Sequence, residues 1–157
     1  MIGLFLQDNM KDIKQKLYQS CQLFIADRLK TITDVMEANQ SALLSETKSS
    51  AGDKHETGRA MLQLEMEKAG QQLASVKAMQ EVLKRININN KSNVICLGSL
   101  VVTDKAAYFL AISAGKITID GVDYFAISSN SPIGKQLLGK KEGAIISFNG
   151  AVILKVY

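Results

Sequence analysis

A proline-free region with a helical pattern of apolar residues spans residues 10–86. The only proline of the chain is Pro132, so every position in this region keeps the backbone N–H that a helix needs. Apolar residues recur there at steps of four and three, with one step of seven in each half, as in helices that pack along a narrow seam. In the first half they are Ile25, Leu29, Ile32, Met36 and Leu43; in the second, Leu62, Met66, Ala69, Leu73, Val76 and Leu83. Because each stripe needs one partner and the other half is the nearest, the pattern predicts a long antiparallel helical hairpin, a coiled coil.

A Ser- and Gly-rich stretch at residues 45–53 separates the two halves. This composition favours a turn, which places the tip of the hairpin near residues 47–58. The second helix should contain about 33 residues and extend roughly 50 Å. Met10 is an alternative start, which would make residues 1–9 a disordered extension of the hairpin.

The apolar pattern changes after a polar, Asn-rich linker at residues 87–93. From Val94 onward the pattern is typical of strands, and Asp120-Gly121 and Asn149-Gly150 are turn signals of the kind that joins them. The expected strands are 94–97, 99–103, 106–112, 116–119, 122–127, 144–148 and 151–157. These features predict a second domain, residues 94–157, built on an antiparallel, strongly curved sheet, and an α+β fold class.

One short helix is expected between these strands. Ser131 can cap it, and Pro132 suits its first turn. Leu137 and Leu138 are expected to face inward, and Gly139 to end the helix. The helix would then cross one face of the sheet.

The net charge and the spacing of the cysteines exclude some classes of function. The net charge is +4, and residues 10–86 and 87–157 contribute about +2 and +3, so neither part is a polybasic nucleic-acid domain. Cys21 and Cys96 lack the spacing of a metal site and are expected to be reduced, mostly buried thiols. The chain shows neither a membrane span nor a signal peptide. We therefore expect a cytoplasmic protein, most simply a monomer, without a membrane partner.

The segment from residue 130 to 143 reads Asn-Ser-Pro-Ile-Gly-Lys-Gln-Leu-Leu-Gly-Lys-Lys-Glu-Gly. Together with the preceding hairpin, it resembles the Gre family of bacterial transcript-cleavage factors. The resemblance implies an FKBP-like fold for the C-terminal domain and docking of that domain on RNA polymerase. For the polymerase contact we single out the loop of Asn130, Ser131, Pro132, Ile133 and Gly134, because exposed turns on a rigid scaffold commonly carry binding residues.

The hairpin tip contains Gly52-Asp53-Lys54-His55-Glu56, and the Gre family carries two acids with this spacing. The resemblance implies that Asp53 and Glu56 are catalytic and metal-binding residues that act inside the polymerase secondary channel. There they would help to hold a second Mg²⁺ and orient a water, since two-metal hydrolysis needs one ion on each reacting oxygen. The Mg²⁺ would be shared with the polymerase active site and not bound by the isolated protein, which would be an accessory factor rather than an enzyme.

Three basic residues near these acids, Lys48, Lys54 and Arg59, are candidate contacts for the phosphates of the nascent RNA 3′ end in the polymerase. Equally, they could only relieve repulsion between the acids. Asp53 and Glu56 also fit a capping box at a helix start. Glu46 is expected to be a solvated side chain, and the lone His55 has no ligand set around it.

Two other functions stay open. The residues after Glu56, Thr57-Gly58-Arg59-Ala60, depart from the Asn-Ala-Glu-Tyr-like run of the family. This departure keeps open a regulator that occupies the secondary channel without promoting cleavage. A prolyl isomerase is less favoured, because it needs an aromatic-lined pocket and fold alone does not imply that activity.

Overall fold

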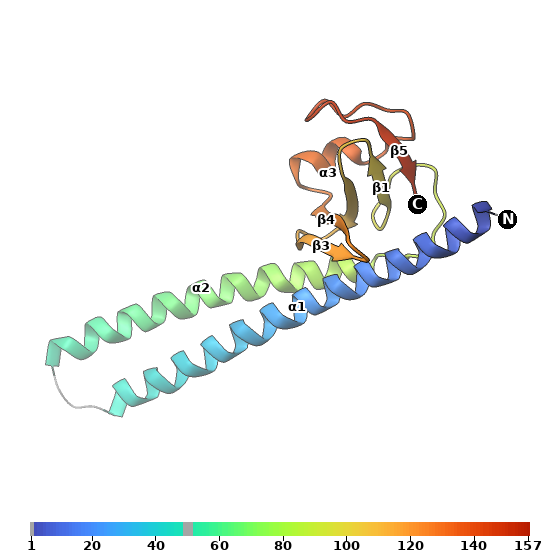
Figure 1. Cartoon of the computed structure of the whole chain (residues 1–157). Coiled ribbons are helices and arrows are strands. Elements are labelled where there is room, and N and C mark those ends of the chain that lie inside the picture. Colours follow the sequence, from blue (N-terminus) through green and yellow to red (C-terminus); the bar gives the residue numbers. More distant parts are fainter. Residues whose placement is uncertain (1, 49–51) are drawn as a thin grey trace. The chain divides into compact units, whose positions relative to one another are not determined.

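The computed structural model describes the backbone of residues 2–48 and 52–157, and the side chains of residues 8–45 and 57–157. The chain divides into two compact units. The helical unit comprises Ile25–Gln80, and the mixed unit comprises Met1–Phe24 together with Glu81–Tyr157. The order of elements is α1, α2, β1, β2, β3, β4, α3 and β5 (Figure 1).

Two long helices supply the helical unit, α1 (Ile2–Lys48) and α2 (Gly52–Lys84). Within this unit they run side by side in opposite directions (Figure 1). α1 begins at Ile2, so the expectation of a disordered extension before Met10 is wrong for residues 2–9. α2 ends two residues before the predicted limit, Ile86, and residues 49–51 of the predicted turn lie outside the described residues. No helix in the described part of the chain combines the length and apolar character of a membrane span.

The seam of the helical unit follows the predicted stripe closely. Ile25, Ile32, Ala69 and Val76 are buried, and the other stripe residues of this unit are partly buried. Asn39 occupies the step of seven in the first stripe and is only 8% exposed. Its Nδ2 is the buried side-chain atom without a hydrogen-bond partner among the described residues. The seam therefore contains a buried amide where its repeat calls for an apolar residue.

The mixed unit contains a five-stranded sheet in the order β3-β4-β2-β1-β5. The strands are β1 (Leu100–Thr103), β2 (Ala107–Ala111), β3 (Gly115–Ile119), β4 (Val122–Ser128) and β5 (Ile153–Val156). β1 pairs antiparallel with β2 and β5, and β3 pairs antiparallel with β4. β2 and β4, in contrast, are parallel, with Phe109 opposite Ala126. The sheet is mixed, so the predicted all-antiparallel sheet is wrong.

The parallel pair arises from the short connection between β2 and β3. Only residues 112–114 separate these strands, yet β3 lies two positions from β2 and leaves the place between them to β4. Two strand spacings amount to about 10 Å, which three extended residues can span. Gly115 begins β3 at φ 79°, a left-handed conformation that favours glycine. Asp120 and Gly121 then form the predicted tight turn, both with positive φ.

Two predicted strands do not form. Residues 94–97 pair with another segment only at Ile95, whose N–H donates to the carbonyl of Lys140 at 2.9 Å and whose carbonyl accepts from Gly139 N–H at 2.8 Å. Residues 144–148 contribute a single bridge, Ile145 to Val152. Both segments turn too soon to form strands: Cys96 O accepts from Ser99 N–H, and Ile146 O accepts from Gly150 N–H.

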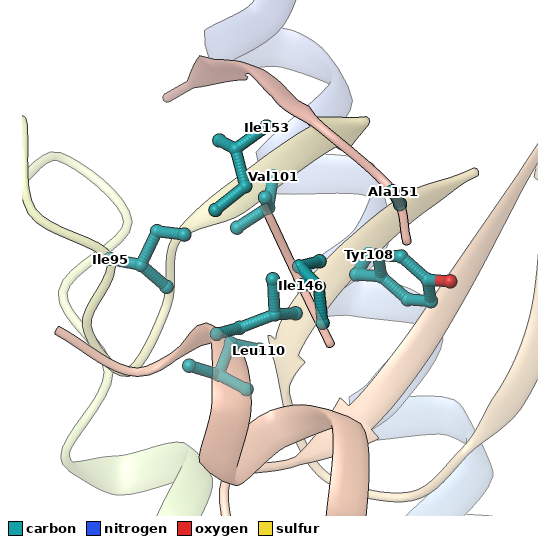
Figure 2. Close-up of a cluster of buried hydrophobic side chains, with 8 residues drawn as sticks. Ile95, Val101, Tyr108, Leu110, Ile146, Ala151 and Ile153 are labelled. Carbon is teal, nitrogen blue, oxygen red and sulfur yellow. The ribbon is translucent and has the colours of Figure 1, made fainter. Parts of the chain in front are cut away.

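The core of the mixed unit gathers residues that lie far apart in the sequence. Figure 2 shows Ile95, Val101, Tyr108, Leu110, Ile146, Ala151 and Ile153 converging from the segment before β1, the sheet and the C-terminal segment. Leu137 of α3 (Pro132–Leu137) completes this cluster. Leu137 is fully buried, but Leu138 is 48% exposed, so the expectation that both face inward is wrong for Leu138. The physical reason is the helix end: Leu138 has left helical geometry, with ψ 127°.

The N-terminal part of α1 is held within the mixed unit by polar contacts as well as apolar ones. Lys14 Nζ donates to the carbonyl of Tyr157 at 3.2 Å, and the Tyr18 hydroxyl donates to the carbonyl of Leu83 at 3.1 Å. Lys16 forms an exposed ion pair with Asp120 at 3.6 Å. Leu17 and Cys21 are fully buried between these contacts.

Candidate functional site

The predicted catalytic acids lie at the start of α2. The helix begins at Gly52, so Asp53 and Glu56 belong to its first turns. Their side chains lie outside the described residues, as do those of Lys48, the last residue of α1, and Lys54. Helical positions three apart share one face, as a joint contact with one metal ion requires. In a capping box, Asp53 would be the residue just before the helix. The described helix begins at Gly52, and assigned helix ends commonly differ by one or two residues. Both roles of the acids therefore stay open.

Arg59 is the predicted RNA contact whose side chain is described. It is exposed on α2 and lies three positions, slightly less than one helical turn, after Glu56. Thr57, also exposed, and the half-buried Gly58 continue the same helix. The departure from the family pattern at residues 57–60 therefore falls in regular helix, where it changes side chains without interrupting the backbone.

The predicted docking loop is a capped helix start. The Ser131 hydroxyl accepts from Gly134 N–H at 3.1 Å and donates to the carbonyl of Ser128 at 2.6 Å. Ser131 has the extended conformation of an N-cap, and Pro132 follows at the first helical position. The predicted capping of α3 is therefore confirmed.

Gly134 is required by the same turn. A Cβ atom at this position would lie 2.0 Å from the carbonyl oxygen of Ser128, a backbone atom that cannot move aside cheaply. Ile133 is half-buried against the core of the mixed unit. Three of the five predicted docking residues, Ser131, Ile133 and Gly134, thus have structural roles within the chain.

The remaining two predicted docking residues, Asn130 and Pro132, are exposed. The backbone N–H of Asn130 donates to the Ser128 hydroxyl at 3.1 Å, which fixes the loop and leaves its side chain toward solvent. A partner that contacts this loop would therefore meet Asn130 and Pro132 first.

The loop from residue 147 to 150 is anchored to α3, a link that sequence reasoning missed. Gln136 Oε1 accepts from the backbone N–H of Phe148 at 2.7 Å and from the Ser147 hydroxyl at 3.3 Å. Phe148 itself is 59% exposed, and Ile145 is 65% exposed. A glutamine on a short helix gives no sequence signal for such a link, because its partner is a backbone N–H.

Sequence reasoning also missed Lys14. This lysine is only 4% exposed, although lysines are rarely buried unless paired. Burial lowers the pKa of its ammonium group, an effect that proximity to Cys96 partly opposes. The signal was present: Met10, Lys14, Leu17 and Cys21 recur at steps of four, three and four, which places a lysine on the inward stripe.

Among the side chains that the structure describes, no group of three or more His, Cys, Asp or Glu residues could hold a metal ion. The proposed Mg²⁺ ligands, Asp53 and Glu56, are two carboxylates of the type that Mg²⁺ prefers. Mg²⁺ is commonly bound through one or two carboxylates, and waters or other oxygen ligands fill the rest of its six-fold shell.

Comparison with known proteins adds no assignment. No protein-family model matches the chain, and no curated protein matches its sequence.

Proposed function

We propose that this protein is an accessory factor of bacterial RNA polymerase that inserts the tip of its helical pair into the secondary channel and stimulates cleavage of backtracked RNA. In this proposal the helical pair is a coiled coil and the mixed unit is an FKBP-like docking domain, as in the Gre family. The isolated protein would not be an enzyme; it would complete the site of one.

One observation carries the proposal: two acids three residues apart begin the second of two long paired helices. α1 has 47 residues and α2 has 33, and both meet the segment at residues 49–51. This places Asp53 and Glu56 at the end of a pair of helices, where they can approach a site inside a larger enzyme. Mg²⁺ is a hard cation with oxygen ligands, and a weakly held second ion would gain from the two added carboxylates.

The capped loop supports the docking part of the proposal. Ser131, Pro132 and Gly134 build the turn from inside, and Asn130 and the Pro132 ring are presented outside. A rigid turn of this kind binds without a large ordering cost, since its conformation is already fixed.

Stalled, backtracked elongation complexes with 3′-labelled RNA provide the test. We expect the wild-type protein, with Mg²⁺ present, to release short 3′ fragments rapidly, and the Asp53→Ala, Glu56→Ala double variant to bind polymerase without stimulating release. The Glu65→Ala, Glu67→Ala double variant is a matched control, because both acids are exposed on the same helix. Binding without stimulated release by the wild-type protein would contradict the cleavage role.

A non-cleaving regulator of the same shape is the second candidate. The specific observation in its favour is the run Thr57-Gly58-Arg59-Ala60, which replaces the family's usual residues in the helix beside the acids. Such a regulator would change nucleotide entry or initiation in the same assay and leave backtracked RNA intact. Asp53 and Glu56 would then act mainly as acids near a helix N-terminus, where they stabilise the helix.

A further inference from the structure

We propose that the mixed unit carries a binding site for a phosphate-bearing ligand of nucleotide size. The site is a pocket of about 360 Å³ between residues 8–14 of α1, residues 88–93 of the linker and residues 156–157 at the end of β5. All of its lining residues belong to the mixed unit. The proposal uses neither the acids of α2 nor the Asn130–Gly134 loop, so it stands independently of the proposed function.

Lys14 is the most buried of the charged residues that line this pocket. Its side chain lines the cavity, and the residue is 4% exposed. Its Nζ donates to the carbonyl of Tyr157 at 3.2 Å, and no carboxylate side chain pairs with it in the described part of the chain. An ammonium group has three donors, and the Tyr157 oxygen accepts from one of them, which leaves two for a ligand. An anion in the pocket would accept from these remaining donors and pair with the buried ammonium group.

The rim of the pocket has the same sign of charge. Lys11 and Lys91 are exposed and line the cavity, and Asp8 is the acid among the lining residues. Three lysines against one aspartate give the lining side chains a net charge of +2. Lysines bind phosphate as point charges, so this rim favours a ligand with more than one negative charge.

The walls of the pocket suit more than a bare anion. Met10, Ile88 and Val156 offer apolar surface. Asn89, Asn90 and Asn93 line the same cavity, and no hydrogen bond within the described residues occupies their side-chain amides. Amide groups can both donate to and accept from a base or sugar. The cavity volume lies in the range of small-molecule sites, about 300–1,000 Å³, which fits a nucleotide better than an inorganic phosphate.

Hydrogen bonds within the linker fix the wall of the pocket that the linker forms. The carbonyl of Asn87 accepts from Asn90 N–H at 3.1 Å, and the side chain of Asn87 accepts from Asn89 N–H at 3.1 Å. The Ser92 hydroxyl is engaged with the backbone of Val94 in both directions. The linker is thus a set of linked turns whose free polar groups are the three amides and Lys91. Preformed polar groups of this kind are what orient a ligand in a pocket.

Isothermal titration of the full chain with ADP, adenosine and pyrophosphate tests the proposal. We expect ADP to bind, and adenosine and pyrophosphate each to bind at least about tenfold more weakly, because each offers only half of the contacts. The exposed pair Lys11→Gln, Lys91→Gln should weaken ADP binding by about tenfold or more without affecting folding. Lys30→Gln is the control, since Lys30 is exposed in the helical unit and pairs with Asp34.

Side-chain amide resonances give a second readout. ADP should shift the NMR signals of Asn89, Asn90 and Asn93 in the wild-type chain, and Lys14→Met should reduce the binding while circular dichroism shows a retained fold. Absence of binding by any probe would overturn the site. Equal affinity for ADP and pyrophosphate, or unchanged binding by the Lys11→Gln, Lys91→Gln variant, would also overturn it.

Discussion

The two units of this chain bury their apolar residues in different ways. The helical unit fully buries about one residue per two turns along each helix; in the described part of this unit these residues are Ile25, Ile32, Asn39, Ala69 and Val76. In the mixed unit Phe109, Leu110 and Ile146 are completely buried. The cluster that contains Leu110 and Ile146 combines residues of the sheet, of α3 and of the segments before β1 and before β5. A single seam has no second layer to compensate for a poor contact, whereas a layered core has neighbours on every side.

This difference predicts unequal local stability. Opening of a segment costs less where few buried apolar contacts hold it. The helical unit, with one seam and a buried amide in it, should therefore exchange its backbone amides faster than the mixed unit. For a protein whose proposed action depends on the end of its helices, the less stable unit is also the proposed functional one.

The largest expected effect comes from the layered core. Phe109→Ala removes a fully buried ring from β2 and should lower the free energy of unfolding by about 3–5 kcal/mol. Phe148→Ala, in contrast, truncates a ring that is 59% exposed and should cost far less. Urea denaturation followed by circular dichroism measures both. Similar losses in the two variants would show that the core is not the layered structure described above.

A buried thiol should make the mixed unit sensitive to alkali. Burial raises the pKa of Cys21 to about 12 from the ordinary value of 9.0. The unfolded chain therefore releases this proton first, and stability falls as the pH rises from about 9 toward 12. At pH 10.5 the loss should reach about 2 kcal/mol.

Urea midpoints of the wild type and of Cys21→Ala at pH 8 and pH 10.5 measure this dependence. The wild type should lose more stability between the two pH values than Cys21→Ala does, since the variant lacks the thiol. Cys96→Ala, at a partly exposed cysteine, is the control. Parallel losses in the wild type and Cys21→Ala would contradict the assignment.

The buried amide of Asn39 in the helical unit predicts a smaller effect, and this effect is a gain of stability rather than a loss. Asn39→Leu replaces an amide whose Nδ2 lacks a partner among the described residues and should stabilise the seam by about 1–2 kcal/mol. Gln40→Leu, at an exposed neighbouring position, should leave the seam unchanged. Amide hydrogen exchange over residues 25–80 reports the difference. Faster exchange in Asn39→Leu would mean that the amide is satisfied in solution, for example by a bound water.

The smallest expected effect concerns surface charge. Lys16 contacts Asp12 at 3.3 Å and Asp120 at 3.6 Å, and its pKa is raised, first by the hydrogen bond with Asp12. All three groups are solvent-exposed, and exposed ion pairs contribute little because water and salt screen them. Lys16→Gln should leave the melting temperature unchanged within error at physiological salt. A clearly lower melting temperature of Lys16→Gln than of the wild type, with the difference unchanged by added salt, would indicate that this contact anchors α1 in the mixed unit.

Much of the helical unit could be predicted because its pattern is local. Steps of four and three fix which residues face the seam, and the absence of proline allows the helices to run without interruption. The capping of α3 and the Asp120-Gly121 turn were also local, since a cap or a tight turn depends on residues within a few positions.

The features that could not be predicted from the sequence depend on contacts between distant residues. The parallel pairing of β2 with β4 follows from where β3 settles, and no residue of β2 signals it. Exposure of Leu138 and burial of Lys14 depend on the backbone at a helix end and on a distant carbonyl. The candidate acids, Asp53 and Glu56, came from motif resemblance, and their side chains lie outside the described residues. Their roles remain a prediction for the cleavage assay.

The turn from Ser128 to Gly134 has a consequence for relationships between proteins. Its glycine is required because a Cβ atom would clash with a carbonyl, and its serine and proline are favoured because one caps the helix and the other suits its first position. The same local preferences hold in any protein that contains this turn, whatever the protein binds. Similar residues in this segment therefore reflect the fold of the turn. Differences in binding partner are expected at Asn130, at the ring of Pro132 and at the start of α2.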